Sequence, residues 1–161
     1  MNRGAVRIRV RPLLNEFGRR LLVGVGLFFW MSGCGGGGST SPANGLTGVW
    51  NGTLSQPNGP IYKQFTYSMD LRESGSSVTG TARISLIGQP QYYGDFAVDG
   101  TKNGSEFDFT ELRITAQVPP PAGSSWCLKR GALMLGSNGR TLSGNWTSAG
   151  CAPGTISLTR G

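Results

Sequence analysis

The 161-residue chain contains no histidine, the side chain that most often serves proteins as a general acid or base and as a metal ligand. It also contains no G-x-S-x-G nucleophile motif, no P-loop and no dinucleotide-binding fingerprint. Acid–base chemistry would therefore depend on a pair of carboxylates. Four of them, Asp70, Asp95, Asp99 and Asp108, alternate with apolar residues, so we expect them to face solvent. The sequence predicts no enzyme, no metal and no cofactor.

Glu111 is the carboxylate that breaks this alternation. It follows Phe107 and Phe109 at a spacing of two residues, which would turn all three side chains to the same face of a strand. A single bulge at Thr110-Glu111 would restore the alternation and turn Glu111 outward, and this is the arrangement we expect. An inward, functional carboxylate is the alternative.

The first 33 residues have the composition of a secretory signal. Six arginines precede residue 21, and an apolar run at 21–31 follows. This run is shorter than the roughly 20 residues of a membrane-spanning helix. The sequence Met31-Ser32-Gly33-Cys34 resembles the bacterial lipobox, which implies cleavage before Cys34 and a lipid on that cysteine. Arg19-Arg20 leaves both the general secretory and the twin-arginine route open.

The lipobox resemblance implies a protein attached to the cell envelope. Residues 34–45 are rich in glycine and serine and are expected to form a flexible tether. Gly35 in place of Asp after the cysteine favours the outer membrane of a Gram-negative host, facing the periplasm or the surface. Residues 34–161 carry nine basic and seven acidic side chains, so the net charge of +7 falls to +2 without the leader. We expect no nucleic-acid partner.

Two cysteines remain once Cys34 is assigned to the lipid. In an oxidising compartment, an even number of remaining cysteines favours a disulfide between Cys127 and Cys151. Closing this segment would stabilise the fold by about 3 kcal/mol. A pair of reduced, buried thiols is the alternative.

Residues 46–161 are predicted to form one all-β domain. Short alternating runs rich in Val, Ile, Thr and aromatic residues recur between Gly, Pro, Asn and Ser. They predict eight strands, at 46–54, 61–72, 77–86, 92–100, 105–116, 126–135, 141–148 and 154–160. Tight turns alternate with longer connections at 55–60, 87–91, 117–124 and 149–153. This arrangement favours a single antiparallel up-and-down barrel, which has no free edge strand.

Three hairpins give the expected registers. Turns at Ser74-Gly75, Asn103-Gly104 and Asn138-Gly139 supply the glycines that tight turns require. Pairing outward from them sets Leu71 opposite Val78, Met69 opposite Gly80, Tyr67 opposite Ala82, Phe65 opposite Ile84, Gly100 opposite Phe107, Val98 opposite Phe109, Phe96 opposite Leu112, Gly94 opposite Ile114, Leu135 opposite Leu142, Leu133 opposite Gly144 and Gly131 opposite Trp146. Large residues thus face small ones, which predicts a filled barrel without a deep central cavity.

Gly48-Val49-Trp50 resembles the G-x-W motif that opens the first strand of lipocalins and avidin-like proteins. The resemblance implies a calycin-type barrel whose floor is plugged by Trp50, with Trp146 as a second core tryptophan. Avidin-like proteins carry a polar biotin ligand two residues after this tryptophan, and the position is Gly52 here, so biotin is not expected. Bacterial metalloprotease inhibitors share a similar disulfide-bearing barrel, which leaves an inhibitory role open.

Aromatic residues gather at the end of the barrel with the longer connections. Tyr62, Tyr92, Tyr93 and Trp126 are the candidate contacts for a small apolar or aromatic ligand, or for an envelope protein. The alternative is that they only cap the barrel. The sequence therefore favours a lipid-anchored binding module over a packed structural lipoprotein, a protease-inhibitor-like barrel and, last, an enzyme.

Overall fold

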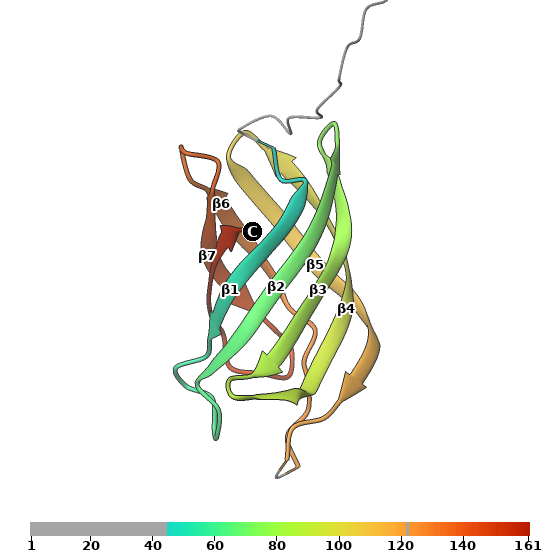
Figure 1. The fold of residues 1–161 in the computed structure, drawn as a ribbon, viewed down its shortest axis with the longest axis vertical. Coiled ribbons are helices and arrows are strands. Elements are labelled where there is room, and N and C mark those ends of the chain that lie inside the picture. Colours follow the sequence, from blue (N-terminus) through green and yellow to red (C-terminus); the bar gives the residue numbers. More distant parts are fainter. Residues whose placement is uncertain (1–44, 122) are drawn as a thin grey trace, which may run out of the picture. The chain divides into compact units, whose positions relative to one another are not determined.

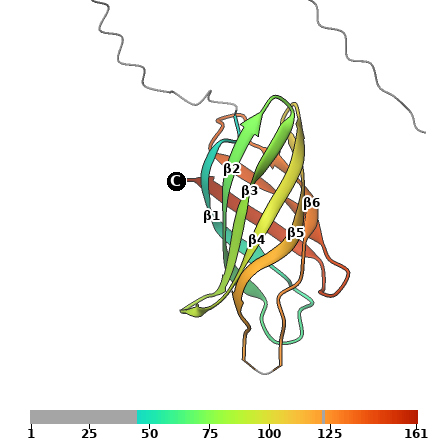
Figure 2. The ribbon, with the colours of Figure 1, turned by 90° about the vertical axis from the view of Figure 1, so that its right-hand side faces the viewer.

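A computed structural model describes residues 45–121 and 123–161, which form a closed antiparallel barrel of eight strands (Figures 1 and 2). Each strand pairs with the next along the chain, and β8 pairs with β1 to close the barrel. The strands are β1 (Gly48–Ser55), β2 (Gln64–Ser74), β3 (Ser77–Leu86), β4 (Gln89–Asn103), β5 (Glu106–Val118), β6 (Arg130–Leu135), β7 (Thr141–Thr147) and β8 (Gly154–Arg160). The predicted all-β barrel is confirmed. The leader, Cys34 and the tether up to residue 44 lie outside the described residues.

The strands form because apolar and polar residues alternate along them. In β2, Phe65, Tyr67, Met69 and Leu71 are buried, whereas the residues between them face outward. The same period of two turns the inner face of every strand toward one core. No helix in the described residues is long and apolar enough to cross a membrane.

Two of the three predicted hairpin registers are wrong by two residues. The β2–β3 turn is Gly75-Ser76, so Leu71 pairs with Gly80, Met69 with Ala82, Tyr67 with Ile84 and Phe65 with Leu86. The β4–β5 turn is Gly104-Ser105, so Gly100 pairs with Phe109 and Val98 with Glu111. In both turns the glycine takes the first central position, with φ of 63° and 61°, where hairpin turns need a positive φ. The predicted β6–β7 pairs are confirmed.

The predicted bulge at Thr110-Glu111 is also wrong. The extra residue is Leu112, because Val98 pairs with Glu111 while the preceding Ala97 pairs with Arg113. Leu112 is consequently 53% exposed, and Glu111 points into the barrel with 2% exposure. A second register shift lies between Asp95 and Phe96, which pairs with Ile114. The two bulges bend the far part of β5 away from the regular ladder.

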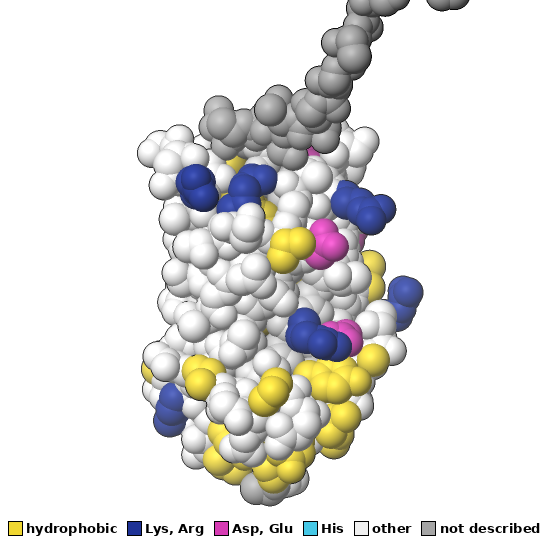
Figure 3. All heavy atoms as spheres, in the orientation of Figure 1, with side chains coloured by type: hydrophobic (Ala, Val, Ile, Leu, Met, Phe, Trp, Pro, Cys, Tyr) yellow, Lys and Arg dark blue, Asp and Glu magenta, His cyan; other side chains and the backbone are white. Residues whose placement is uncertain are grey.

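The expected longer connection at 87–91 is in fact a two-residue turn. Leu86 pairs with Gln89, and Gly88 adopts a φ of 75° between them. The other three connections at this end are longer, so the end is framed by the β1–β2, β5–β6 and β7–β8 segments (Figure 1). Figure 3 shows apolar side chains gathered at this end of the barrel, over the longer connections. We call it the open end.

The opposite end, which we call the closed end, is filled by side chains. The Trp50 indole is fully buried, and its N–H donates to the Leu46 carbonyl at 2.8 Å. The Arg160 guanidinium lies over the Trp50 ring at 4.5 Å and donates to the Thr47 and Gly139 carbonyls at 2.7 and 3.1 Å. Glu73 accepts from the Leu46 N–H at 2.6 Å. Trp50 is therefore a fully buried residue of the closed end, as expected for a core tryptophan.

Candidate functional site

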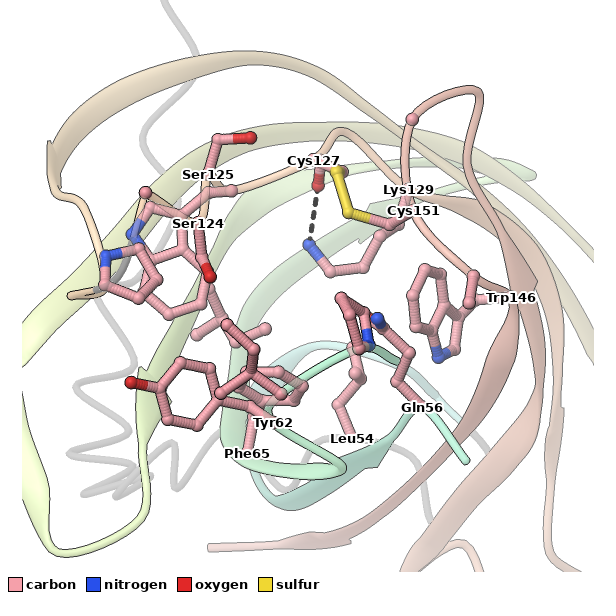
Figure 4. Close-up of a pocket in the computed structure, with 18 residues that line it drawn as sticks. Leu54, Gln56, Tyr62, Phe65, Ser124, Ser125, Cys127, Lys129, Trp146 and Cys151 are labelled. Carbon is pink, nitrogen blue, oxygen red and sulfur yellow. Dashed lines mark hydrogen bonds between the residues drawn. A yellow bond between two sulfur atoms is a disulfide. The ribbon is translucent and has the colours of Figure 1, made fainter. Parts of the chain in front are cut away.

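The barrel interior contains a cavity of about 370 Å³ at the open end (Figure 4). This volume lies in the range of small-molecule sites in proteins. The walls come from the inner faces of β1, β2, β3 and β7 and from the long connections. The apolar part of the lining includes Leu54, Ile61, Tyr62, Phe65, Ile84, Trp126 and Trp146. The cavity thus has a mixed apolar and polar lining, and residues of the barrel core form its floor.

Trp126 forms the wall on the side of the β5–β6 connection. Its indole N–H donates to the Val118 carbonyl at 3.0 Å, and its ring meets Phe65 edge-on with centroids 6.0 Å apart. Gly94 makes room for this ring, since a Cβ there would lie 3.0 Å from the indole. Phe65 in turn packs edge-on against Tyr62, with centroids 6.4 Å apart. A row of three aromatic rings therefore lines the cavity.

The structure places the four predicted aromatic contacts in two groups. Tyr62 and Trp126 line the cavity, and their role as ligand contacts stays a prediction. Tyr92 is partly buried against the core, and Tyr93 lies against the Arg83 guanidinium at 4.5 Å, beside the exposed ion pair of Arg83 with Asp95. Neither Tyr92 nor Tyr93 is among the lining residues of the cavity.

The predicted disulfide between Cys127 and Cys151 is confirmed, with Cα atoms 6.1 Å apart. Both cysteines line the cavity, so the bond joins the β5–β6 and β7–β8 connections at its rim. This link restrains two of the three segments that frame the open end. Their loops are thereby held in place around the cavity before any ligand arrives.

A buried ion pair that the sequence analysis missed lies deeper in the barrel. The Lys129 ammonium is 3.0 Å from Glu111 Oε2, and the two side chains are 3% and 0% exposed. Glu111 also accepts from the Tyr67 hydroxyl at 2.7 Å and from the Lys129 backbone N–H at 2.9 Å. Lys129 donates further to the Cys127 carbonyl at 2.9 Å and lies over the Phe96 ring at 4.2 Å.

Burial shifts the pKa values of Lys129 and Tyr67. Desolvation lowers the pKa of Lys129, and the Glu111 carboxylate opposes that shift. The pKa of Tyr67 is raised well above its ordinary value, first by burial and then by the neighbouring Glu111 charge and hydrogen bond. Tyr67 therefore keeps its proton and remains a donor to Glu111. Glu111 is not among the lining residues, so its inward orientation serves the ion pair rather than the cavity surface.

The remaining polar lining comes mainly from Gln56 and two serines of the β5–β6 connection. Gln56 is 8% exposed and follows β1 directly. In Figure 4 it lies near Leu54 and Trp146, across the cavity from Ser124 and Ser125. Lys129 is the single charged residue among the described ones that line the cavity. Within the described residues no group of three or more acidic, cysteine or histidine side chains could hold a metal ion.

The sequence carried a signal for both missed residues. Lys129 lies in phase with Gly131 and Leu133 on the inner face of β6, and Gln56 lies in phase with Trp50 and Leu54 of β1. Gln56 continues the alternation past the predicted strand end at residue 54, whereas Lys129 lies within the predicted strand 126–135. Comparison with known proteins finds no matching family model and no matching curated protein. The site must therefore be interpreted from its own geometry.

Proposed function

We propose that this barrel is a binding module that holds a small, largely apolar ligand in the open-end cavity. The observation that carries this proposal is the cavity itself, about 370 Å³ and lined by three aromatic rings packed edge to face. Eight-stranded barrels have room either for their own side chains or for one small ligand. In this barrel side chains fill the closed end, and the open end has room for a small ligand.

The cavity chemistry supports recognition of an apolar body. Aromatic and aliphatic side chains form the apolar part of the lining, and Gln56, Ser124, Ser125 and Lys129 supply polar groups beside them, a combination found in small-molecule sites. The rim continues the apolar part, because Ile61 and Ile87 are more than half exposed there and Val118 is 39% exposed. A ligand that enters would remove apolar surface from water on both sides of the contact.

The binding proposal can be tested by blocking the cavity. Ser124→Trp should weaken the binding of 2-ethylnaphthalene at least tenfold, because a large side chain at this half-buried position occupies the space between the walls. The measurement is calorimetric titration of the full chain carrying Cys34→Ala, which removes the proposed acylation site. Ser137→Trp, in the exposed β6–β7 turn at the closed end, is the matched control. Equal binding by both variants, or none by the parent, would contradict the proposal.

We further propose that the module is exported and attached to the cell envelope through a lipid on Cys34. The described chain begins at the closed end, where the Leu46 N–H binds Glu73 and the Gly45 carbonyl accepts from Arg160. The cavity lies at the opposite end of the barrel. The described chain therefore enters the barrel at the end opposite the cavity.

The anchor proposal has its own test. The protein should sediment with membranes, and its mass should show a diacylglyceryl group on Cys34. The Cys34→Ala protein should lose both properties and appear in the soluble fraction. A wild-type protein that keeps residues 1–33 and carries no lipid would refute the lipobox assignment.

A further inference from the structure

We propose that the ligand of the open-end cavity is a neutral molecule with an amide-like headgroup, which pairs with the side-chain amide of Gln56. This inference rests on the proposed binding function and specifies its ligand class. A primary amide offers an N–H donor and a carbonyl acceptor side by side. A carboxamide, lactam or imide presents the complementary pair, so two parallel hydrogen bonds can form at once.

The first support is that the Gln56 amide lines the cavity and has no hydrogen-bond partner among the described residues. Gln56 is 8% exposed and lines the cavity, yet its side chain makes no hydrogen bond to any described residue. Its backbone is fully engaged: the N–H donates to the Lys63 carbonyl at 2.8 Å, and the carbonyl accepts from Gly59 at 2.9 Å. No fully buried side-chain nitrogen or oxygen of the described residues lacks a partner, so the two amide atoms of Gln56 reach accessible space. The amide is therefore available to a molecule in the cavity.

The second support is the way in which the β1–β2 connection holds this amide. A Cβ at Gly59 would lie 2.5 Å from Gln56 Nε2 and 2.6 Å from the Tyr62 carbonyl oxygen. Only glycine lets the chain pass this close to the amide. The connection is thus folded closely around the Gln56 side chain, and its own backbone hydrogen bonds do not need that side chain.

The third support is that the cavity offers no free charge to a ligand. Lys129 is the charged residue in the described lining, and its ammonium already donates to both Glu111 oxygens and to the Cys127 carbonyl. A cationic ligand would meet the like charge of Lys129. An anionic ligand would bring a second negative charge to a cation that Glu111 already neutralises. A neutral headgroup avoids both costs.

The fourth support is the position of the two serines. Ser124 and Ser125 lie across the cavity from Gln56 (Figure 4), and neither side chain makes a hydrogen bond to the described residues. Their hydroxyl groups can serve a second polar atom of the same ligand. The polar groups available to a ligand therefore lie on two opposite walls, with aromatic rings between them.

The test compares two probes of similar shape. In the Gln56→Leu variant, 2-naphthamide should bind at least tenfold more weakly than in the parent, whereas the binding of 2-ethylnaphthalene should change by less than threefold. A site that hydrogen-bonds its ligand discriminates strongly against an analogue that cannot replace those bonds. Gln64→Leu, an exposed glutamine in β2, is the matched control and should leave both constants unchanged. Both variants are measured by calorimetric titration in the full Cys34→Ala chain.

Each other outcome has a defined meaning. If Gln56→Leu weakens both probes equally, or neither, Gln56 does not recognise the headgroup and the inference fails. If 2-naphthoate binds more tightly than 2-naphthamide to the parent, the cavity is selective for anions and the inference also fails. If no probe binds to the parent, the proposed binding function itself fails. A parent that binds 2-ethylnaphthalene but gains nothing from the amide overturns only the present inference.

Discussion

The two ends of the barrel each contain a buried tryptophan, and they use it differently. Trp50 at the closed end and Trp146 at the open end are 0% and 1% exposed. Each indole N–H donates to a backbone carbonyl, that of Leu46 at 2.8 Å and that of Ser55 at 3.2 Å. The Trp50 ring is covered by the Arg160 guanidinium, whereas Trp146 forms part of the cavity wall. The same residue type completes the core at one end and forms part of the cavity wall at the other.

The difference comes from what the chain places over each ring. At the closed end Arg160 joins β8 to the segment before β1 through the Thr47 carbonyl, and Glu73 joins that segment to β2 through the Leu46 N–H. At the open end the disulfide ties two loops together at the rim without filling the space between them. The closed end is thus built for stability, and the open end keeps the walls of the cavity in place.

The largest expected effect follows from exchanging each tryptophan for alanine. Trp50→Ala should destabilise the barrel by about 5 kcal/mol, at the upper end of the usual range, since Arg160 loses its aromatic partner as well. Trp146→Ala should cost about 3 kcal/mol, because a residue that already borders a cavity loses fewer contacts. Urea unfolding measures both. Equal losses would show that the two ends are packed alike and would remove the contrast.

The buried ion pair lies between the two ends and provides the next test. Lys129→Met should destabilise the fold by about 3 kcal/mol, because the Glu111 charge stays buried with only Tyr67 and one backbone N–H as donors. Glu111→Gln combined with Lys129→Met should recover most of this loss, since no uncompensated charge remains. A double-mutant cycle of unfolding free energies gives the coupling. Additive losses would mean that the two side chains do not act as a pair.

The sequence predicted the barrel well because its alternation is regular within each strand. It did not predict the strand register where two different turns leave the apolar side chains on the same face of the sheet. Moving the β2–β3 turn from Ser74-Gly75 to Gly75-Ser76 shifts every pair by two residues and leaves each side chain on its own face. The hydrophobic pattern alone does not distinguish these registers. The observed pairing of Ser74 with Ser77 does distinguish them, and it is a property of the folded hairpin.

The misplacement of Glu111 has a different cause. Taken alone, an inward glutamate is unfavourable, so a bulge that turned it outward was the reasonable expectation. Lys129 lies in phase with Gly131 and Leu133 on the inner face of the adjacent strand. Its ammonium compensates the buried charge of Glu111. Two opposite charges on the inner faces of neighbouring strands were visible in the sequence as a pair. The cavity was not visible, because its volume depends on how the loops pack.

The smallest expected effects separate the aromatic residues that line the cavity from those that do not. Trp126→Ala should weaken the binding of 2-ethylnaphthalene by about 2 kcal/mol, roughly thirtyfold, because its ring forms one wall. Trp126→Phe keeps an apolar ring but loses the hydrogen bond to Val118, and should cost less. Tyr93→Ala should change binding by less than twofold. It should also change stability by less than about 1 kcal/mol, because Tyr93 contacts the exposed Arg83.

This last comparison limits where the ligand lies. Calorimetric titration and urea unfolding of the three variants separate lost contacts from lost folding, since Trp126→Ala also removes packing against Phe65 and Gly94. A Tyr93→Ala variant that binds as poorly as Trp126→Ala would place the ligand over the outer rim of β3 and β4 rather than inside the barrel. If the loss is confined to Trp126, the open end acts through its interior walls, and the exposed apolar rim only surrounds the entrance.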